Sequence, residues 1–339
     1  VNLPAKSDGL RTSQLSALTE VIHRERTADR LGTLLDALET DRQSLSDDDR
    51  VVVDDARRNH DRIRKIPEWF ASRQARQQSV AYGKWVEARK SGDFGLFAPS
   101  LKEQIELSRE EAAFVGSHSD AYSYMVDQFD RGLDIATIER LFQPLSRALS
   151  ELVKTIQESD RFGAARELTG FAKDKQRAFL EEVIRAIGFD FSHGRLDESI
   201  HPFCSGDGLD IRMTTRFFED NPLDSLYSSI HEAGHAMYEQ GLPSDEMGNA
   251  LGSSVGMAVH ESQSRLWENQ VARSEAFWRH WEPRYREVFG EELAGVSSEQ
   301  WLEKVFDVRP IPIRVDSDEV TYNLHIIIRF ELERALFDG

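Results

Sequence analysis

Apolar residues recur at intervals of three and four along most of the chain, a spacing that is typical of amphipathic α-helices. An acidic first turn, such as the one that begins at Asp47, supports the start of one of these helices. The predicted helices cover residues 15–38 (as two helices), 47–63, 68–90, 101–115, 121–129, 135–156, 173–187 and 320–336. We therefore predict a mainly α-helical fold.

Alternation of apolar and polar residues, which is the pattern of a half-buried strand, is scarce. The best candidate strands are residues 209–217 and 252–259, both rich in Gly, Ser, Thr or β-branched residues. We find neither a repeat of about 20–50 residues nor a low-complexity linker. We predict one helical domain over residues 1–339, with a helical scaffold in 1–190 and the functional site in 200–339.

Composition narrows the class of protein. The 339 residues are 40% hydrophobic, which is enough for a sizeable core. The net charge of −18 argues against a surface for nucleic acid or for an anionic membrane. The single cysteine, Cys204, excludes an internal disulfide and a Cys-based zinc site, and we expect a cytoplasmic protein. Because the chain begins at Val1 and ends at Gly339, just after a predicted helix, we expect it to be a fragment.

The most informative segment contains the pattern H-E-x-x-H, formed by His231, Glu232 and His235. Side chains four positions apart lie on one face of a helix, so the two imidazoles can bind one metal ion. Asn221 and Pro222 provide a helix start and Gly241 a helix stop, as this arrangement requires. Glu232 can then reach a metal-bound water without being a ligand. The alternative is a pair of hydrogen-bonded core histidines.

A third ligand is expected from a following helix, since zinc hydrolases keep three protein ligands and one open position. The candidates are Glu239, Glu246, Glu261, Glu268 and, as a rival by chemistry, His260. The loop 241–252 lets the next helix fold back on the first, which favours Glu261 and leaves Glu268 as the second choice. His260 and Glu261 point about 100° apart on a helix, so only one of them can face the metal.

Two further polar segments flank this region. In the predicted strand 209–217, Asp210, Arg212 and Thr214 share one face and can line a substrate groove, although a solvent-exposed face explains them equally well. Downstream, Asp316 and Glu319 have the spacing of a capping box before the helix 320–336. The acidic pair of Asp316 and Glu319 therefore also has a purely structural interpretation, as the cap of that helix.

Taken in order, these segments resemble the carboxypeptidase Taq family of thermostable metallocarboxypeptidases. The family motifs D-x-R-x-T, H-E-x-x-H, H-E-S-Q and I-R-x-x-A-D-E match Asp210 to Thr214, His231 to His235, His260 to Gln263 and Ile313 to Glu319, with Ser317 in place of the alanine. Family members extend further at both ends, and their last motif, G-x-x-Q-D-x-H-W, does not occur in this chain. The resemblance implies a metal-dependent carboxypeptidase that hydrolyses the C-terminal peptide bond of peptides. Because the last motif is absent, one alternative is a fragment that binds metal and hydrolyses peptides poorly.

The resemblance implies a role for each matched residue. His231, His235 and Glu261 would bind one divalent metal, zinc by default and cobalt as the alternative, and Glu232 would be the general base on a metal-bound water. A guanidinium, that of Arg212 by preference or that of Arg314, would pair with the terminal carboxylate of the peptide. The other expected substrate-binding residues are Asp210, Thr214 and His260, and His201 is expected near the groove.

The resemblance also implies an architecture. We expect a large helical saddle with a deep central groove, similar to neurolysin and angiotensin-converting enzyme, with a very small sheet beside the metal helix. Peptide substrates and a homodimer are expected, without nucleic-acid or membrane partners. The alternatives are an oligopeptidase or aminopeptidase on a related fold and a non-catalytic, metal-stabilised peptide-binding protein.

Overall fold

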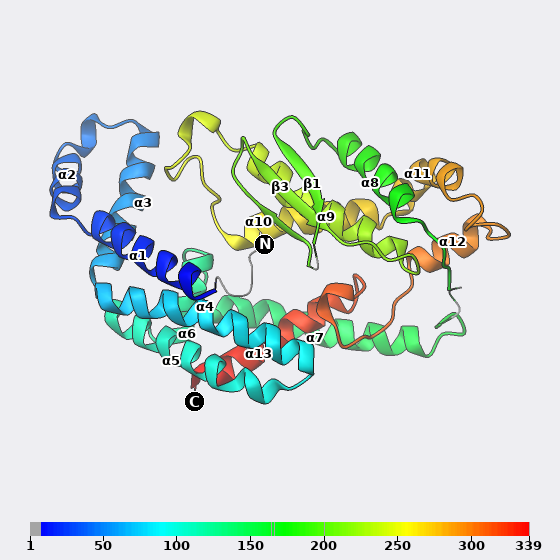
Figure 1. The fold of residues 1–339 in the computed structure, drawn as a ribbon, viewed down its shortest axis with the longest axis horizontal. Helices are drawn as coiled ribbons and strands as arrows, with labels where there is room; N and C mark the ends of the chain where they lie inside the picture. Colours follow the sequence, from blue (N-terminus) through cyan, green and yellow to red (C-terminus); the bar gives the residue numbers. More distant parts are fainter. Residues whose placement is uncertain (1–7, 164, 166, 200, 339) are drawn as a thin grey trace. The chain divides into compact units, whose positions relative to one another are not determined.

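A computed structural model describes residues 8–163, 165, 167–199 and 201–338. The chain divides into two compact units. Unit 1 comprises residues 1–134 and 332–339, and unit 2 comprises residues 135–331. Nearly all regular structure in the described residues is helical, so the prediction of a mainly α-helical fold with a very small sheet is confirmed (Figure 1).

Unit 1 is built from helices whose ends follow ordinary capping rules. Its helices are α1 (Asp8–Arg26), α2 (Asp29–Thr40), α3 (Asp47–Arg64), α4 (Glu68–Ser91), α5 (Ala98–Val115) and α6 (Ala121–Phe129), with the short turns η2 (Arg42–Ser44) and η3 (Phe94–Leu96). Ser46 accepts a hydrogen bond from the Asp49 amide and so starts α3, while Gly92 ends α4 at a positive φ of 69°. Phe70 and Tyr124 lie at the centre of a core between α4, α5 and α6.

Unit 2 contains the remaining helices and the sheet. Its helical elements are α7 (Ile135–Gln157), α8 (Lys173–Ile187), α9 (Pro222–Gln240), η4 (Ser244–Glu246), α10 (Met257–Arg265), η5 (Leu266–Ala272), α11 (Glu275–Val288), α12 (Ser298–Val305) and η6 (Arg314–Asp316). A further helix, α13 (Tyr322–Asp338), begins in unit 2 and ends in unit 1. The element η5 is a π-helical stretch that continues directly from α10.

The sheet has three short strands, β1 (Gly194–Glu198), β2 (Phe203–Ser205) and β3 (Ile211–Thr215), in the order β1-β3-β2. β3 pairs in parallel with β1 and antiparallel with β2. The predicted strand 209–217 is thus confirmed over Ile211–Thr215. The predicted strand 252–259 is wrong, because residues 252–256 form a turn followed by an irregular loop and α10 begins at Met257. Gly252 explains the turn, since a Cβ there would lie 2.3 Å from the Glu246 carbonyl oxygen.

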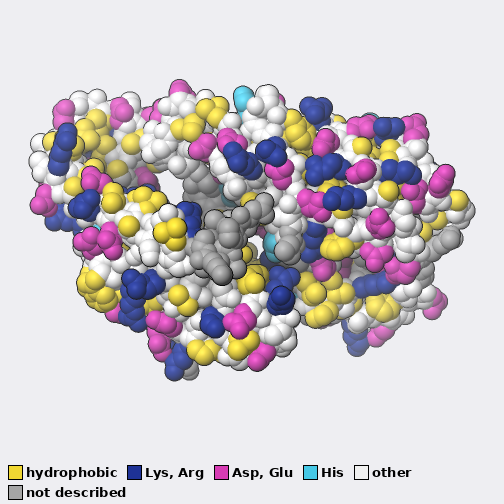
Figure 2. Space-filling view, viewed as in Figure 1, with side chains coloured by type: hydrophobic (Ala, Val, Ile, Leu, Met, Phe, Trp, Pro, Cys, Tyr) yellow, Lys and Arg dark blue, Asp and Glu magenta, His cyan; other side chains and the backbone are white. Residues whose placement is uncertain are grey.

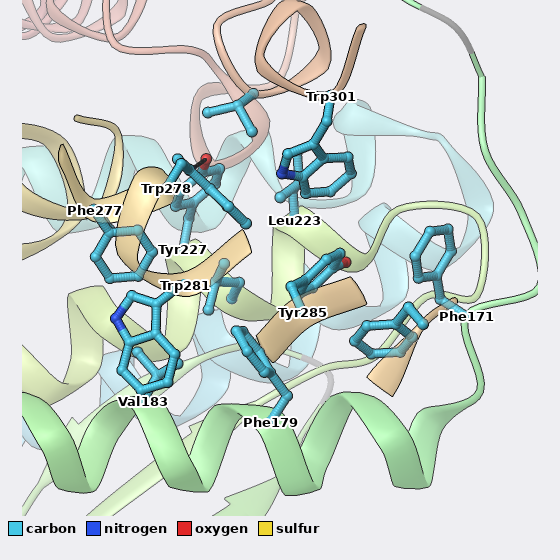
Figure 3. Close-up of a cluster of buried hydrophobic side chains, with 14 of the residues drawn as sticks. Phe171, Phe179, Val183, Leu223, Tyr227, Phe277, Trp278, Trp281, Tyr285 and Trp301 are labelled. Atoms are coloured by element: carbon cyan, nitrogen blue, oxygen red, sulfur yellow. Dashed lines mark hydrogen bonds between the residues drawn. The ribbon is translucent and has the colours of Figure 1, made fainter. Parts of the chain in front are cut away.

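Helix α9 lies between two apolar clusters of unit 2. Leu226 and Ile230 face a core of aromatic side chains from α8, α11 and α12, in which Trp278 and Trp301 are fully buried (Figure 3). Ala233 and Ala236 pack instead on the sheet and α8. These contacts fix the rotation of α9 about its axis and direct the remaining face towards α10.

Charged side chains of both signs are spread over the surface. Lys and Arg are interspersed with Asp and Glu over the visible face (Figure 2). Within the described residues, no helix is both long enough and apolar enough to span a bilayer.

Candidate metal centre

The face of α9 that points away from the two cores carries His231 and His235. The helix starts at Pro222, whose missing amide hydrogen costs nothing in a first turn, and carries Asp224 near its positive end. One turn separates the two histidines, and their ring centroids are 4.9 Å apart. Glu232, the residue between them in the motif, is only 7% exposed.

A glycine brings the third candidate ligand to these histidines. A Cβ on Gly234 would lie 2.5 Å from the Ser264 Cα, so only a glycine permits α9 and α10 to approach this closely. The Glu261 side chain on α10 therefore reaches both rings. Its Oε2 lies 3.7 Å from the His231 Nε2 and 3.2 Å from the His235 Nε2. Ligand atoms of the three residues all lie within 4.8 Å of one another.

The other nitrogen of each ring is occupied by a different partner. The His231 Nδ1 is 2.9 Å from the Glu268 Oε2, and the His235 Nδ1 is 2.6 Å from the His260 Nδ1. The His260 Nε2 in turn lies 2.8 Å from the Glu239 Oε1. These contacts orient both rings so that the Nε2 atoms face Glu261, as the histidine ligands of metal sites usually are.

The donor set therefore fits a divalent cation such as zinc, which prefers imidazole nitrogen and carboxylate oxygen. The other candidates for the third ligand have different partners. Glu268 and His260 contact the Nδ1 atoms of the two histidines, and Glu239 contacts His260. Glu246 accepts a hydrogen bond from the Asn249 side chain at 2.5 Å.

Electrostatics separates the roles of the two glutamates near the histidines. Burial alone raises the pKa of Glu261, but the hydrogen bond from His235 and the electrostatic attraction of His231 and His235 outweigh it and lower this pKa to about 2. Burial dominates at Glu232 and raises its pKa above the usual value. Glu261 is thus suited to binding a cation as a carboxylate, and Glu232 to accepting and returning a proton.

A pocket of about 630 Å³ opens beside this centre within unit 2. His231 and Glu232 line it, together with His201, Arg314 and Tyr322. The Arg314 Nη1 donates to the Tyr322 hydroxyl at 2.6 Å, and that hydroxyl lies 3.4 Å from the Glu261 Oε1. Tyr322 is not among the expected site residues, although it lies only three residues after Glu319, the end of the last matched motif.

The residues predicted from the D-x-R-x-T segment lie elsewhere. Arg212 donates to Asp210 through two hydrogen bonds of 3.0 and 2.7 Å, and both side chains are exposed. Thr214 is buried and accepts a hydrogen bond from the Phe203 amide. None of the three lines the pocket, whereas Arg314 does.

The acidic cluster before α13 caps that helix through a different residue from the one expected. Asp318, not Asp316, accepts hydrogen bonds from the amides of Val320 and Thr321. Asp316 instead pairs with Arg216, which also binds Asp224. The predicted capping box of Asp316 and Glu319 is wrong, because the chain turns at η6 and α13 begins only at Tyr322, whereas an N-cap at Asp316 requires the helix to begin at Ser317.

Comparison with known proteins gives consistent matches. A family model described as carboxypeptidase Taq (M32) metallopeptidase matches residues 1–339. Thermostable carboxypeptidase 1 of Thermus thermophilus is 38% identical over 99% of this chain and 68% of the relative. Carboxypeptidase 1 of Bacillus subtilis is 33% identical over 97% of this chain and 66% of the relative.

Solved structures give the same result. An M32 carboxypeptidase from Deinococcus radiodurans is 40% identical with a TM-score of 0.88, and the match covers 100% of this chain and 68% of that one. Trypanosoma cruzi metallocarboxypeptidase 1 is 32% identical with a TM-score of 0.87, over the same shares of the two chains. The chain thus spans about two thirds of the length of these relatives.

Proposed function

Because this chain belongs to the carboxypeptidase Taq (M32) family of metallopeptidases, we propose that it hydrolyses the C-terminal peptide bond of peptides. The observation that carries the proposal is the convergence of His231, His235 and Glu261 beside a buried Glu232 at the edge of a pocket. Each of these groups has the chemistry that a metal-dependent hydrolase requires.

We infer that His231, His235 and Glu261 hold one divalent cation, with zinc preferred and cobalt as the alternative. When bound, such a cation acts as a Lewis acid that acidifies a water and polarises a carbonyl. Glu268 and His260 would not bind it directly. They would hold the two imidazoles in the tautomer that leaves each Nε2 free to bind it.

Glu232 is proposed as the general base. It would accept a proton from the attacking water as the new carbon–oxygen bond forms, and would return this proton to the departing amine as the carbon–nitrogen bond breaks. Burial supports this assignment, because a raised pKa brings the carboxyl closer to the pH at which it must both take and give a proton.

Arg314 is the better placed of the two arginines for the terminal carboxylate of the peptide. It lines the pocket and contacts Tyr322, and it has no carboxylate partner among the described residues. Arg212 is already paired with Asp210 outside the pocket. A planar guanidinium that is free to form two parallel hydrogen bonds suits a carboxylate.

Digestion of a defined peptide tests the activity. The protein, equilibrated with zinc or cobalt, is incubated with an N-acetylated peptide, with the same peptide amidated at its C-terminus and with the unblocked peptide. The products are identified by mass spectrometry. Loss of single residues from the free C-terminus only is expected. Internal cuts would instead indicate an oligopeptidase. Loss of the first residue from an unblocked peptide would indicate an aminopeptidase. Metal binding with no turnover would indicate a peptide-binding protein or a catalytically weak fragment.

The native metal, a homodimer and a cytoplasmic location also belong to this proposal. Metal analysis of the purified protein tests the first, and light scattering tests the second. Fractionation of the producing cells tests the third.

A further inference from the structure

A single carboxylate, that of Glu268, links His231 to an arginine on the neighbouring helix. The Glu268 Oε2 is 2.9 Å from the His231 Nδ1 and 2.7 Å from the Arg265 Nη1. Arg273 lies 3.6 Å from the other oxygen. The Glu268 side chain is only 11% exposed, so these positive groups replace the water that a carboxylate otherwise requires. They also lower its pKa, against the effect of burial.

The guanidinium of the same arginine lies over the ring of a tyrosine. The Arg265 Cζ is 3.7 Å from the ring centroid of Tyr322, well within the distance of a cation–π contact. The Tyr322 hydroxyl is the group that reaches the Glu261 Oε1, at 3.4 Å. The Arg265 guanidinium therefore contacts two side chains that reach the metal centre. Its Nη1 binds Glu268, the partner of His231, and its Cζ lies over the ring of Tyr322, the partner of Glu261.

We propose that Arg265 is a positioning residue that fixes the orientations of His231 and Glu261 relative to each other. This inference rests on the metal centre proposed above. A lysine cannot replace the arginine fully, because an ammonium group offers a charge without the planar group that lies over the Tyr322 ring. The role is thus specific to the guanidinium.

The local backbone explains how one side chain reaches both partners. Arg265 is four residues after Glu261, so both lie on the same face of α10. The helix then widens into the π-helical stretch η5, in which Glu268 follows three residues later. Such stretches occur frequently at functional sites, because the extra residue changes which side chains face a given direction. Here the change brings Glu268 behind His231.

His235 is oriented by residues other than Arg265, so the proposal predicts an effect on only one side of the metal centre. His235 is oriented by His260 and Glu239, and neither contacts Arg265 in the described hydrogen bonds. Loss of Arg265 should therefore disturb the His231 and Glu261 side of the centre. A residue that only anchored α10 would instead change the stability of the protein without changing the geometry of the metal centre.

Zinc affinity tests the proposal without any assay of activity. Arg265→Lys and Arg265→Gln are compared with the parent by competition against a chromophoric chelator, and the matched control is Arg279→Lys, an exposed arginine paired with Glu275 on α11. We expect a loss of affinity of about 10–100-fold for the Gln variant, a smaller loss for the Lys variant and none for the control. The visible spectrum of the cobalt-loaded Lys variant should also change, because the ligand geometry changes.

A double-mutant cycle separates positioning from simple anchoring. Glu268→Gln and Tyr322→Phe should have coupled effects on zinc affinity in the parent and additive effects in the Arg265→Lys background. Unchanged zinc affinity and cobalt spectrum in Arg265→Lys would overturn the proposal, as would additive effects in both backgrounds. A loss of affinity that only follows a lower unfolding temperature of the metal-free protein would overturn it too. If the parent itself bound no zinc, the metal centre rather than the role of Arg265 would be refuted.

Discussion

Replacement of Gly234 by alanine perturbs the proposed metal centre without touching a ligand. The added Cβ would lie 2.5 Å from the Ser264 Cα and 2.7 Å from the Gln263 carbonyl oxygen, and both are backbone atoms that no rotamer change can move away. Helix α10 must retreat by about 1 Å to restore an ordinary contact of 3.4 Å. Glu261 lies one turn before Ser264 and would move with the helix.

The two consequences differ in size. Overpacking in a core costs about 1–3 kcal/mol, while alanine is favoured over glycine inside a helix by about 0.8–1 kcal/mol. The unfolding free energy of the metal-free protein should therefore fall by no more than about 2 kcal/mol. Zinc affinity should fall by about 10–100-fold, because the Glu261 carboxylate leaves its position 3.2 Å from the His235 Nε2.

Chelator competition measures the affinity, and urea unfolding of the metal-free protein measures the stability. Gly83→Ala on α4 is the matched control, since a Cβ there meets nothing within 4 Å and should stabilise the protein by up to about 1 kcal/mol. If Gly234→Ala bound zinc within twofold of the parent, the argument that glycine sets the distance between α9 and α10 would be refuted.

Three further predictions concern catalysis, substrate binding and pH. Glu232→Gln should keep zinc affinity and lower kcat by about 10²–10⁴-fold, and unchanged turnover would exclude Glu232 as the base. Arg314→Met should lower kcat/KM for a peptide with a free C-terminus by about 10–100-fold, mainly through KM, and an effect on kcat alone would contradict its role. Asp127 accepts a hydrogen bond from the Gly132 amide and pairs with Arg58, and these contacts outweigh burial and lower its pKa. Its contribution to stability is therefore complete above the unfolded-state pKa of about 4 and is lost as the pH falls through the lower folded pKa. Asp127→Asn should cost about 1–3 kcal/mol in urea unfolding at pH 7 and much less at pH 3, and an equal cost at both values would contradict this assignment.

The helical part of the fold and the face shared by His231 and His235 could be predicted from spacing alone. Helical periodicity extends over many residues and is therefore a strong signal. The loop before α10 fits the strand pattern without forming a strand, because a short run of small and β-branched residues does not reveal whether a neighbouring strand is available for pairing. Strands β1 and β2 are too short to produce a periodic pattern.

The identity of the proposed third ligand shows the limit of prediction from the sequence more clearly. Spacing left several glutamates and His260 as candidates on chemical grounds. Their places depend on how closely α10 approaches Gly234 and on the π-helical stretch that turns Glu268 behind His231. Both are properties of tertiary packing. The exposed pair of Arg212 and Asp210 likewise could not be distinguished from a groove-lining pair by alternation alone.

Zinc binding by two glutamate variants tests the central claim most directly. Equilibrium dialysis of the parent should give one zinc per chain. Glu261→Ala should lose affinity by more than about 10³-fold because a ligand is removed, whereas Glu268→Gln should lose only about 10–100-fold because an orienting group is weakened. If Glu268→Gln abolished zinc binding while Glu261→Ala retained it, the proposed ligand set of His231, His235 and Glu261 would be contradicted.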